Sequence, residues 1–389
     1  MSDLSIVIWG TYDLSKPRTR LLVDQLRRQI GTVIEIHADI WSGIDDKSTI
    51  RGTHQKLGLL LRWLFAYPRL VWRYLRTQKH DAVVILYMGH VDVLMIRPWA
   101  RLRGVPIVWD VVVTMYETLV DDRAMLRSNS LAGRLTWRWD RCALRAADRA
   151  VLLTNARRDV TAERYALPAH RFAVVPLGAE ADAFPAVTPT PPAEPERLRI
   201  LFYAQFAPMH GLDRVIAAAR LCRDRPFDWR FIGRGQEGWR LEEWIAEAEP
   251  PGVSWVEGVA YSALIDEMAA ADVCLGLFGT STKAETAAPN KLFQILAAGR
   301  GLVTKGTTGI REILGGDWPG IYLVDDDTPE ALTAALDKAW NERALLRDGP
   351  LHSALRVRFA PEAIGRAFAT TVAGAVADAP RKADRQGRR

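Results

Sequence analysis

The stretch AVTPTPPAEPERLRILFYA, residues 186–204, divides the chain into two parts and indicates how each is built. Its proline-rich first part lacks many of the backbone N–H groups that a helix or a central strand needs, so we interpret residues 186–197 as a linker. Its second part, residues 198–204, is a short apolar run of the kind that forms a fully buried strand. A new folding unit is therefore predicted to begin at residue 198.

Short apolar runs alternate with longer amphipathic segments on both sides of this linker. The predicted strands span residues 5–10, 32–38, 81–88, 105–113, 146–154 and 171–178 before it, and 198–204, 228–233, 253–258, 272–278, 300–306 and 320–324 after it. This alternation predicts an α/β protein with two doubly wound parallel sheets, each covered by helices on both faces. Ligands of such sheets bind at the carboxyl ends of the strands, so we expect the site in the cleft between the halves.

Length and composition agree with two globular domains. The chain has 389 residues, 49% of them hydrophobic and 25% charged, which excludes a disordered or fibrous protein. We expect an N-terminal domain over residues 1–185, the linker over 186–197, a C-terminal domain over 198–360, a helix over 361–378 that crosses back to the first domain, and a basic tail over 379–389.

Cysteine content and the N-terminus suggest a compartment. The three cysteines lie far apart and indicate neither a disulfide framework nor a metal site, which favours a reducing environment. The first residues lack the pattern of a secretory signal, and no apolar run has the roughly 18–20 residues of a spanning helix. We therefore expect a cytoplasmic protein.

The net charge of +6 is unevenly distributed. Residues 47–80 contain eight lysines and arginines and no acidic residue, whereas residues 381–389 contain five and one, so the remainder is net acidic. Segment 56–79 also has leucine, tryptophan and tyrosine at three-and-four spacing, which suits a helix on an anionic membrane surface, kinked at Pro68. The alternative is a helix whose apolar stripe packs on the core and whose arginines are solvated.

The segment GTSTKAETAAPNKLFQILAAGRGLVTKG, residues 279–306, carries the strongest functional signal. Pro289 suits the first turn of a helix, and the free N–H groups around Asn290 together with the helix dipole predict an anion site. Lys283 and Lys291 add charge that suits a diphosphate. The alternative is that Pro289 and Asn290 only start a helix and that both lysines are solvated.

This segment resembles the nucleotide-binding segment of glycosyltransferase family 4, a group of retaining transferases with the GT-B fold. It is similar in particular to a bacterial polysaccharide-assembly branch with the pattern PNK-(apolar)-FQ-(apolar)-LA-x-G. The resemblance covers nearly the whole chain except the tail, and it implies two Rossmann-like domains that face each other across a cleft. The donor is then expected on the C-terminal domain and the acceptor mostly on the N-terminal one.

In the wider family this region holds two glutamates eight positions apart, the first facing the transferred sugar and the second the ribose. Thr286 and Gln294 occupy these positions here. The resemblance therefore assigns the ribose to Gln294, which also follows Lys291 by three residues on one helix face. Glu285, adjacent to the first position, is the substitute that the sequence offers at the sugar.

Residues 201–221 resemble the family's first turn in the C-terminal domain, where a basic pair usually grips the diphosphate. Gln205 and His210 stand at those places, followed by Gly211, and Arg234 in the motif FIGRG is expected to supplement the charge. Glu257 belongs to a turn that is expected near the base. The alternative for His210 is a loop histidine that caps a helix.

Two N-terminal stretches complete the resemblance. Residues 10–27 resemble the turn that faces the diphosphate and the acceptor, in which Gly10 permits close backbone approach and Arg18, with Arg20, is suited to phosphate; the alternative is a flexible basic loop.

Residues 108–123 resemble the branch's acidic segment. Asp110 lies at the end of a predicted strand, and Glu117 follows it; a carboxylate there is placed to orient or deprotonate an acceptor hydroxyl. The alternative for this stretch is that Asp122 and Arg123 form only a structural ion pair.

Two other functions stay open at this point. Gly233, Gly235 and Gly238 satisfy G-x-G-x-x-G, with Glu257 about 20 residues on, as in an NAD-dependent oxidoreductase. That pattern is weak and opens the second strand–helix unit of its domain rather than the first. The other alternative is an inactive, membrane-docked scaffold, since residue 286 is not glutamate. Nucleic-acid binding is not expected, because no recognised module is present.

The sequence thus predicts a retaining glycosyltransferase. It would move a sugar from a UDP- or GDP-linked donor to a glycan or polyprenyl-linked acceptor in cell-surface polysaccharide assembly. We expect neither a metal nor a cofactor, and we expect an anionic membrane surface as a further partner of residues 56–79.

Overall fold

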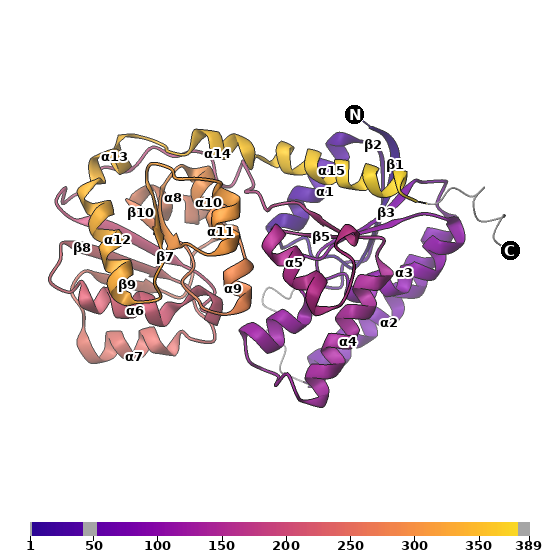
Figure 1. Ribbon diagram of the computed structural model, residues 1–389, viewed down its shortest axis with the longest axis horizontal. Helices are drawn as coiled ribbons and strands as arrows, with labels where there is room; N and C mark the ends of the chain where they lie inside the picture. The colour runs from indigo at the N-terminus through magenta and orange to yellow at the C-terminus, as the bar shows by residue number, and fades with distance from the viewer. Residues whose placement is uncertain (1, 42–52, 380–389) are drawn as a thin grey trace.

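The computed structural model describes residues 2–41 and 53–379 and contains two six-stranded parallel sheets in separate domains (Figure 1). The N-terminal sheet has the order β2-β1-β3-β4-β5-β6. Its strands are β1 (Ser2–Gly10), β2 (Ile30–His37), β3 (Ala82–Ile85), β4 (Ile107–Asp110), β5 (Arg149–Leu152) and β6 (Phe172–Val174). Every predicted strand of this half overlaps one of them.

The C-terminal sheet has the order β12-β11-β10-β7-β8-β9. Its strands are β7 (Leu198–Tyr203), β8 (Phe227–Ile232), β9 (Val253–Val256), β10 (Val273–Leu275), β11 (Gly301–Lys305) and β12 (Ile321–Val324). The six predicted strands of this half are all confirmed. Both sheets are therefore doubly wound, as the alternation of apolar and amphipathic segments predicted.

Helices cover both faces of each sheet. The N-terminal domain has α1 (Pro17–Gln29), α2 (Thr53–Arg76), α3 (His90–Arg103), α4 (Leu131–Ala146), α5 (Asn155–Arg164) and the short helices η2 (Glu117–Asp122) and η3 (Ala169–Arg171). The C-terminal domain has η4 (Pro208–His210), α6 (Leu212–Leu221), α7 (Trp239–Ala248), η5 (Tyr261–Ala263), α8 (Leu264–Ala270), α9 (Thr282–Thr286), α10 (Asn290–Ala298), α11 (Thr308–Leu314), α12 (Pro329–Asn341), α13 (Arg343–Asp348) and α14 (Ser353–Arg358).

The last helix, α15 (Pro361–Ala377), returns from the second domain to the first and packs on α1 (Figure 1). Gly365 makes this approach possible, because a Cβ atom there would lie 2.5 Å from Cβ of Gln25. Gln29 also donates from Nε2 to the carbonyl of Glu362, at 2.9 Å. One apolar core consequently runs from α1 through α15 into the side of the C-terminal sheet that α10 covers.

Segment 186–197 contains no helix or strand, and it lies along the C-terminal domain. The N–H groups of Val187 and Thr190 donate to the carbonyls of Ala298 and Ala269, and the indole of Trp340 donates to the carbonyl of Glu196. These bonds attach the segment to the second domain.

Helix α2 packs on the core by one face only. Tyr67, Leu70 and Tyr74 are buried, as the expected stripe requires, but Leu64 of the same predicted stripe is 63% exposed. Pro68 lies inside the helix, which continues through it to Arg76. Residues 47–52 of the basic segment and residues 380–389 of the tail lie outside the described residues. None of the described helices is long and apolar enough to cross a membrane.

Candidate active site

The carboxyl ends of the strands of both domains face each other, and loops from these ends make the contacts between the domains. Helix η2 follows β4 in the first domain and packs against α9, which follows β10 in the second. This contact lies at the carboxyl edges of the two sheets, where the sequence placed the site.

The predicted anion site lies at the start of α10. Pro289 is the N-cap residue and the helix begins at Asn290, one position later than expected. Lys291 is 5% exposed; its Nζ donates to the carbonyl of Gly276 at 2.9 Å and lies 4.4 Å from the centre of the Phe202 ring. Burial lowers the pKa of Lys291 to about 7, because no carboxylate of the described residues compensates for its lost hydration. A solvated lysine, the alternative interpretation, is wrong for this residue.

His210 lies beside this lysine. Burial and the positive charges of Lys291 and Lys283 hold the pKa of His210 well below its ordinary value, so the imidazole is neutral at pH 7. Its Nδ1 atom is buried and makes no hydrogen bond to the rest of the described chain. The ring also forms hydrogen bonds to the backbone of Gln205 and Ala207, so the single N–H of the neutral imidazole is engaged and the two lysines supply the positive charge at this edge of the sheet.

Gly211 lets the His210 loop close onto the loop after β10. Its φ of +66° is in the left-handed region, and a Cβ atom would lie 2.5 Å from the carbonyl carbon of Phe278. The N–H groups of Phe278 and Gly279 donate to the carbonyls of His210 and Met209, both at 3.1 Å. The two loops therefore form one surface beside Lys291.

Gln294 is fixed by two tyrosines. The hydroxyl of Tyr203 donates to Oε1 of Gln294 at 3.1 Å, and Nε2 of Gln294 donates to the hydroxyl of Tyr261 at 3.4 Å. Tyr261 in turn donates to Glu180 at 2.9 Å, and Glu180 is held by two hydrogen bonds from Arg20. Arg20, predicted to be suited to phosphate, thus links the first domain to Gln294 through a chain of hydrogen bonds.

Three other predicted donor residues lie at the open rim of the second domain. Gln205 is exposed, and Arg234 and Glu257 form an exposed ion pair at 3.6 Å. The nearby Gly233 packs against the carbonyl of Ala204, to which a Cβ atom would approach within 1.9 Å. Gly233 therefore allows the loops that follow β7 and β8 to pack closely.

Gly10 ends β1 with a φ of +129°, and a Cβ atom would lie 2.5 Å from Oδ2 of Asp92. Asp92 is buried and accepts hydrogen bonds from the N–H and hydroxyl of Thr11 and from the hydroxyl of Tyr67. Burial raises the pKa of Asp92 to about 6. The predicted close approach at Gly10 is thus, in this structure, an approach to a buried carboxylate.

Arg18 and Asp110 form a buried ion pair rather than separate sites for phosphate and acceptor. Nε and Nη2 of Arg18 donate to the carboxylate at 2.7–3.0 Å, and the remaining donors reach the carbonyls of Pro176 and Val175. Both side chains are at most 6% exposed. The pair joins α1 to the ends of β4 and β6.

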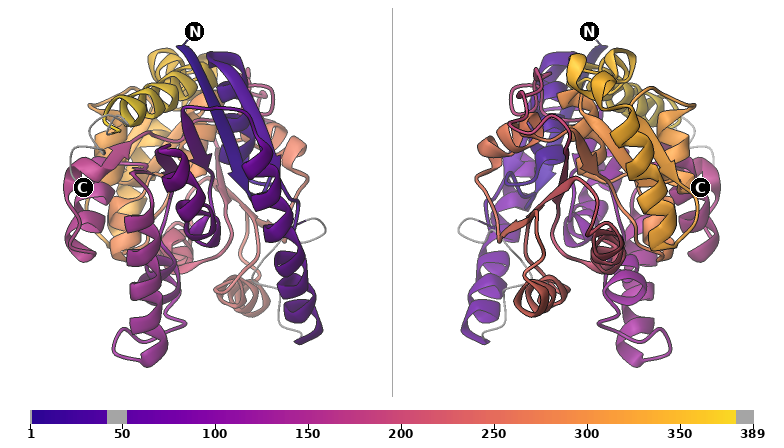
Figure 2. Two further views of the ribbon diagram at one scale, coloured as in Figure 1. Left: turned by 90° about the vertical axis from the view of Figure 1, so that its right-hand side faces the viewer. Right: turned by 90° about the vertical axis from the view of Figure 1, so that its left-hand side faces the viewer.

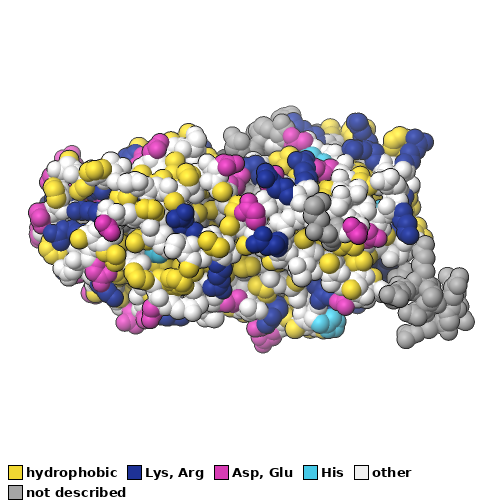
Figure 3. Space-filling model, turned by 90° about the horizontal axis from the view of Figure 1, so that it is seen from above, with side chains coloured by type: hydrophobic (Ala, Val, Ile, Leu, Met, Phe, Trp, Pro, Cys, Tyr) yellow, Lys and Arg dark blue, Asp and Glu magenta, His cyan; other side chains and the backbone are white. Residues whose placement is uncertain are grey.

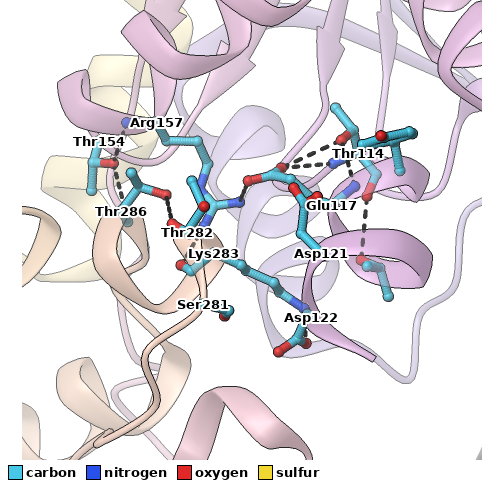
Figure 4. Close-up of polar contacts among 12 residues, drawn as sticks. Thr114, Glu117, Asp121, Asp122, Thr154, Arg157, Ser281, Thr282, Lys283 and Thr286 are labelled. Atoms are coloured by element: carbon cyan, nitrogen blue, oxygen red, sulfur yellow. Dashed lines mark hydrogen bonds and ion pairs between the residues drawn. The ribbon is translucent and has the colours of Figure 1, made fainter. Parts of the chain in front are cut away.

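Glu117, Asp122 and Lys283 belong to a network that crosses between the domains (Figure 4). Glu117 accepts from Nη1 of Arg157 at 2.8 Å, and Nη2 of Arg157 donates to the carbonyl of Lys283 at 3.0 Å. Nζ of Lys283 donates to Asp122 at 2.8 Å. Asp122 is thus paired with a lysine of the other domain rather than with the adjacent Arg123, the partner that the alternative interpretation gave it.

Glu285 and Thr286 also make structural contacts. The carboxylate of Glu285 accepts from the N–H and hydroxyl of Thr308 at the start of α11, at 2.9 and 2.7 Å. Thr286 is buried, and its carbonyl accepts from the hydroxyl of Thr154 in the first domain at 2.8 Å. The carboxylate of Glu285 is thus bound to the start of α11, and Thr286 has no carboxylate.

Sequence reasoning missed Tyr203, Tyr261, Asp92, Arg157 and Glu312. Glu312 of α11 accepts hydrogen bonds from the N–H groups of Asn155 and Ala156, so a glutamate of one domain caps a helix of the other. No local pattern marks these residues, since each acts on a partner that is distant in the sequence.

Comparison with known proteins identifies the family. The description "Glycosyl transferases group 1" matches residues 197–342, and "Glycosyl transferase 4-like domain" matches residues 47–178. Together the two matches cover most of both domains. No curated protein matches the chain.

Solved structures of the same architecture are similar over nearly the full length. Sucrose-phosphate synthase from Thermosynechococcus elongatus has a TM-score of 0.68 at 13% identity, covering 96% of this chain and 99% of its own. HepE from Anabaena, solved with UDP, has a TM-score of 0.65 at 12% identity and coverages of 95% and 100%. The lipopolysaccharide outer core galactosyltransferase WaaB has 0.58 at 12% identity, with coverages of 95% and 98%.

These matches exclude the oxidoreductase and give the inactive scaffold no support. Two doubly wound parallel sheets and family matches in both domains lead to one conclusion: the chain belongs to the group 1 glycosyltransferases of the GT-B fold.

Proposed function

We propose that this glycosyltransferase transfers a hexose, with retention, from a nucleoside-diphosphate sugar to a hydroxyl of a glycan. The observation that carries the proposal is the cluster at the start of α10, where Lys291 is buried without a carboxylate partner next to neutral His210. A buried ammonium with a pKa of about 7 is stabilised strongly by an anion. The N–H groups of Asn290 and Lys291 in the first turn of the helix are further donors for the same anion.

The cluster suits the leaving group of the reaction. Lys291 and the helix start are placed to neutralise the charge that develops on a departing diphosphate, and we propose that this occurs without a metal. In the mechanism that the family resemblance implies, a diphosphate oxygen takes the proton of the acceptor hydroxyl on the same face of the sugar, which gives retention. No enzymic nucleophile is needed, in accord with the engagement of Asp110, Glu117 and Glu285 in structural contacts.

The remaining donor contacts follow from the same geometry. Gln294, held between Tyr203 and Tyr261, is proposed to receive the ribose. Lys283 is proposed to exchange Asp122 for the diphosphate when the donor is present, because both anions compete for the same ammonium. We propose that the acceptor is a lipid-linked glycan of cell-surface polysaccharide assembly, which the relation to WaaB favours.

A thermal-shift and calorimetric screen tests the donor class. UDP, GDP and ADP and their hexose conjugates are compared, and one nucleotide series is expected to bind. NMR of the product then reports the anomeric configuration. Failure of every nucleotide sugar to bind the folded protein would refute the proposal, and an inverted product would refute retention alone.

A further inference from the structure

Three helices form the end of the N-terminal domain that faces away from the second domain. Seen from that end, α3 lies between α2 and α4 (Figure 2, left view), and α3 contacts both. Their inner sides contribute to the core that includes Tyr67, Tyr74 and Ala143. Their outer sides form the surface that we call the three-helix face.

The three-helix face is unusually apolar for a surface. Of the eighteen large apolar side chains that are exposed in the described residues, ten belong to these three helices. Phe65 of α2 is 74% exposed, Leu102 of α3 76% and Leu135 of α4 53%. Clustering of this kind marks an interaction surface rather than scattered exposure.

The apolar residues follow the helical period on two of the helices. On α4, Leu131, Leu135 and Trp139 recur every four residues and so share one side of the helix. On α2, Phe65 and Trp72 are seven apart and also share a side. Both rows point away from the residues that pack on the core, so each helix has an inner and an outer apolar side.

Arginines border these rows, and the described parts of α2, α3 and α4 carry no exposed acidic residue. On α4, Arg134 and Arg138 are exposed next to Leu135, and on α2 the guanidinium of Arg76 lies 3.9 Å from the centre of the Trp72 ring. The only acidic residues of the three helices are Asp92 and Asp140, and both are buried. Figure 3, which looks onto the top of the molecule, shows basic, acidic and apolar side chains mixed over that other face.

We propose that the three-helix face docks on an anionic lipid bilayer, with α2 and α4 both lying in its surface. This deepens the proposed function, because it rests on a lipid-linked acceptor. Apolar rows flanked by arginines match the boundary between acyl chains and anionic headgroups. A second copy of the chain would bring like charges together, and nucleic acid would not require ten exposed apolar side chains.

The face is also connected to the carboxyl edge of the N-terminal sheet. Tyr67, on the inner side of α2, donates to Asp92, and Asp92 holds the N–H of Thr11 in the loop after β1. A bilayer under α2 therefore lies under the helix that supports the acceptor side of the cleft. A lipid-linked acceptor would approach from that side.

Co-sedimentation with vesicles tests the docking. Wild-type protein is expected to bind vesicles rich in phosphatidylglycerol and to bind pure phosphatidylcholine at least tenfold more weakly. The double variants Phe65→Gln/Trp72→Gln and Leu135→Gln/Trp139→Gln are each expected to lose about tenfold in binding to the anionic vesicles. Arg69 is an exposed arginine of α2 four residues after Phe65, and Arg69→Gln and Arg138→Gln are each expected to lose about fivefold. The matched control is Leu221→Gln/Val357→Gln, which removes equally exposed apolar residues from the second domain and should bind like wild type.

Several outcomes would overturn the proposal. These are equal binding to the two vesicle types, unchanged binding of both apolar double variants, or a dimer in sedimentation velocity that the apolar variants dissociate. Binding of a labelled oligonucleotide that is lost in the arginine variants but kept in the apolar ones would indicate nucleic acid instead. Donor binding, measured without vesicles, should be the same in every variant as in the wild type. If the wild type itself bound no donor, the proposed function would be contradicted, and the docking result would still stand.

Discussion

Lys291→Met should stabilise the unliganded protein and at the same time weaken donor binding. The opposite signs arise because Lys291 is a buried cation whose partner is the proposed donor rather than a protein carboxylate. Methionine has a similar length and can keep the contacts with the rings of Phe202 and Tyr203, so the change removes chiefly the charge.

The magnitude follows from the pKa of Lys291, which burial lowers from 10.5 to about 7. An unfolded chain keeps this lysine protonated up to its ordinary pKa, so folding releases a proton between pH 7 and 10.5, and the stability of the wild type rises with pH there. At pH 8 the penalty of burying the lysine is about 3 kcal/mol. Removal of the hydrogen bond from Lys291 to the carbonyl of Gly276 destabilises the variant by about 1–2 kcal/mol and so offsets part of this gain. A net gain of about 1–2 kcal/mol, or a few degrees in Tm, is expected for the variant at pH 8.

The donor side of the prediction has its own pH dependence. A nucleotide sugar has no group that titrates between pH 6 and 8, whereas the fraction of protonated Lys291 falls about tenfold over that range. Wild-type affinity should therefore fall about tenfold from pH 6 to pH 8. The variant should bind about a hundredfold more weakly at pH 6 and should show no such dependence.

Calorimetric titration and thermal melting at pH 6, 7 and 8 measure both effects. Lys338→Met, the same substitution on the exposed side of α12, is the control and should change neither quantity. Donor affinity of Lys291→Met within twofold of wild type would refute the anion site. If Lys291→Met had a lower Tm than wild type and also bound the donor weakly, the buried charge would not destabilise the unliganded protein, but the anion site would still be supported.

The remaining predictions concern contacts that the sequence did not reveal. Asp110→Ala should lower the free energy of unfolding, measured by chemical denaturation, by about 3–5 kcal/mol, because it leaves Arg18 buried without its carboxylate partner. The double variant Arg18→Met/Asp110→Leu should recover much of this loss. Equal stability of Asp110→Ala and wild type would contradict a structural role of the pair. Asp92 binds a proton more tightly in the folded protein than in the unfolded chain, so the free energy of unfolding of the wild type should rise by up to about 3 kcal/mol as the pH falls from about 6 to 4. Asp92→Asn should remove this pH dependence. The control Asp24→Asn, at an exposed carboxylate, should keep it. Glu312→Gln should weaken the contact between Glu312 and the start of α5, which joins the two domains, by about 1–2 kcal/mol. Small-angle scattering should then show a larger unliganded molecule. Identical scattering curves would contradict a role of Glu312 in holding the domains together.

The fold was predictable because its signals are local. Buried parallel strands are short apolar runs, and the helices between them have their own period, so all twelve strands could be located from residue order alone. The proline-rich segment marked the division for an equally local reason. The start of α10 was predicted within one residue, because proline has a fixed place at helix starts.

The site was only partly predictable, because burial and pairing are properties of the assembled chain. Sequence placed Lys291, Gln294 and His210 at one edge of a sheet, and the structure brings them together there. It could not show that Arg18 would meet Asp110 across 92 positions, or that Lys283 would meet Asp122 across 161. Such pairs form because strand ends that are remote in the chain are neighbours in a parallel sheet.

The uneven charge shows the same division. Sequence alone determined that residues 47–80 are basic and apolar, since composition needs no coordinates. Only the tertiary structure decided which side of α2 is buried, and it placed α4, with its own outward row of leucine, tryptophan and arginine, on the same end of the molecule. The physical reason is that a helix apolar on several sides has more than one way to pack, and only its neighbours determine which side remains exposed.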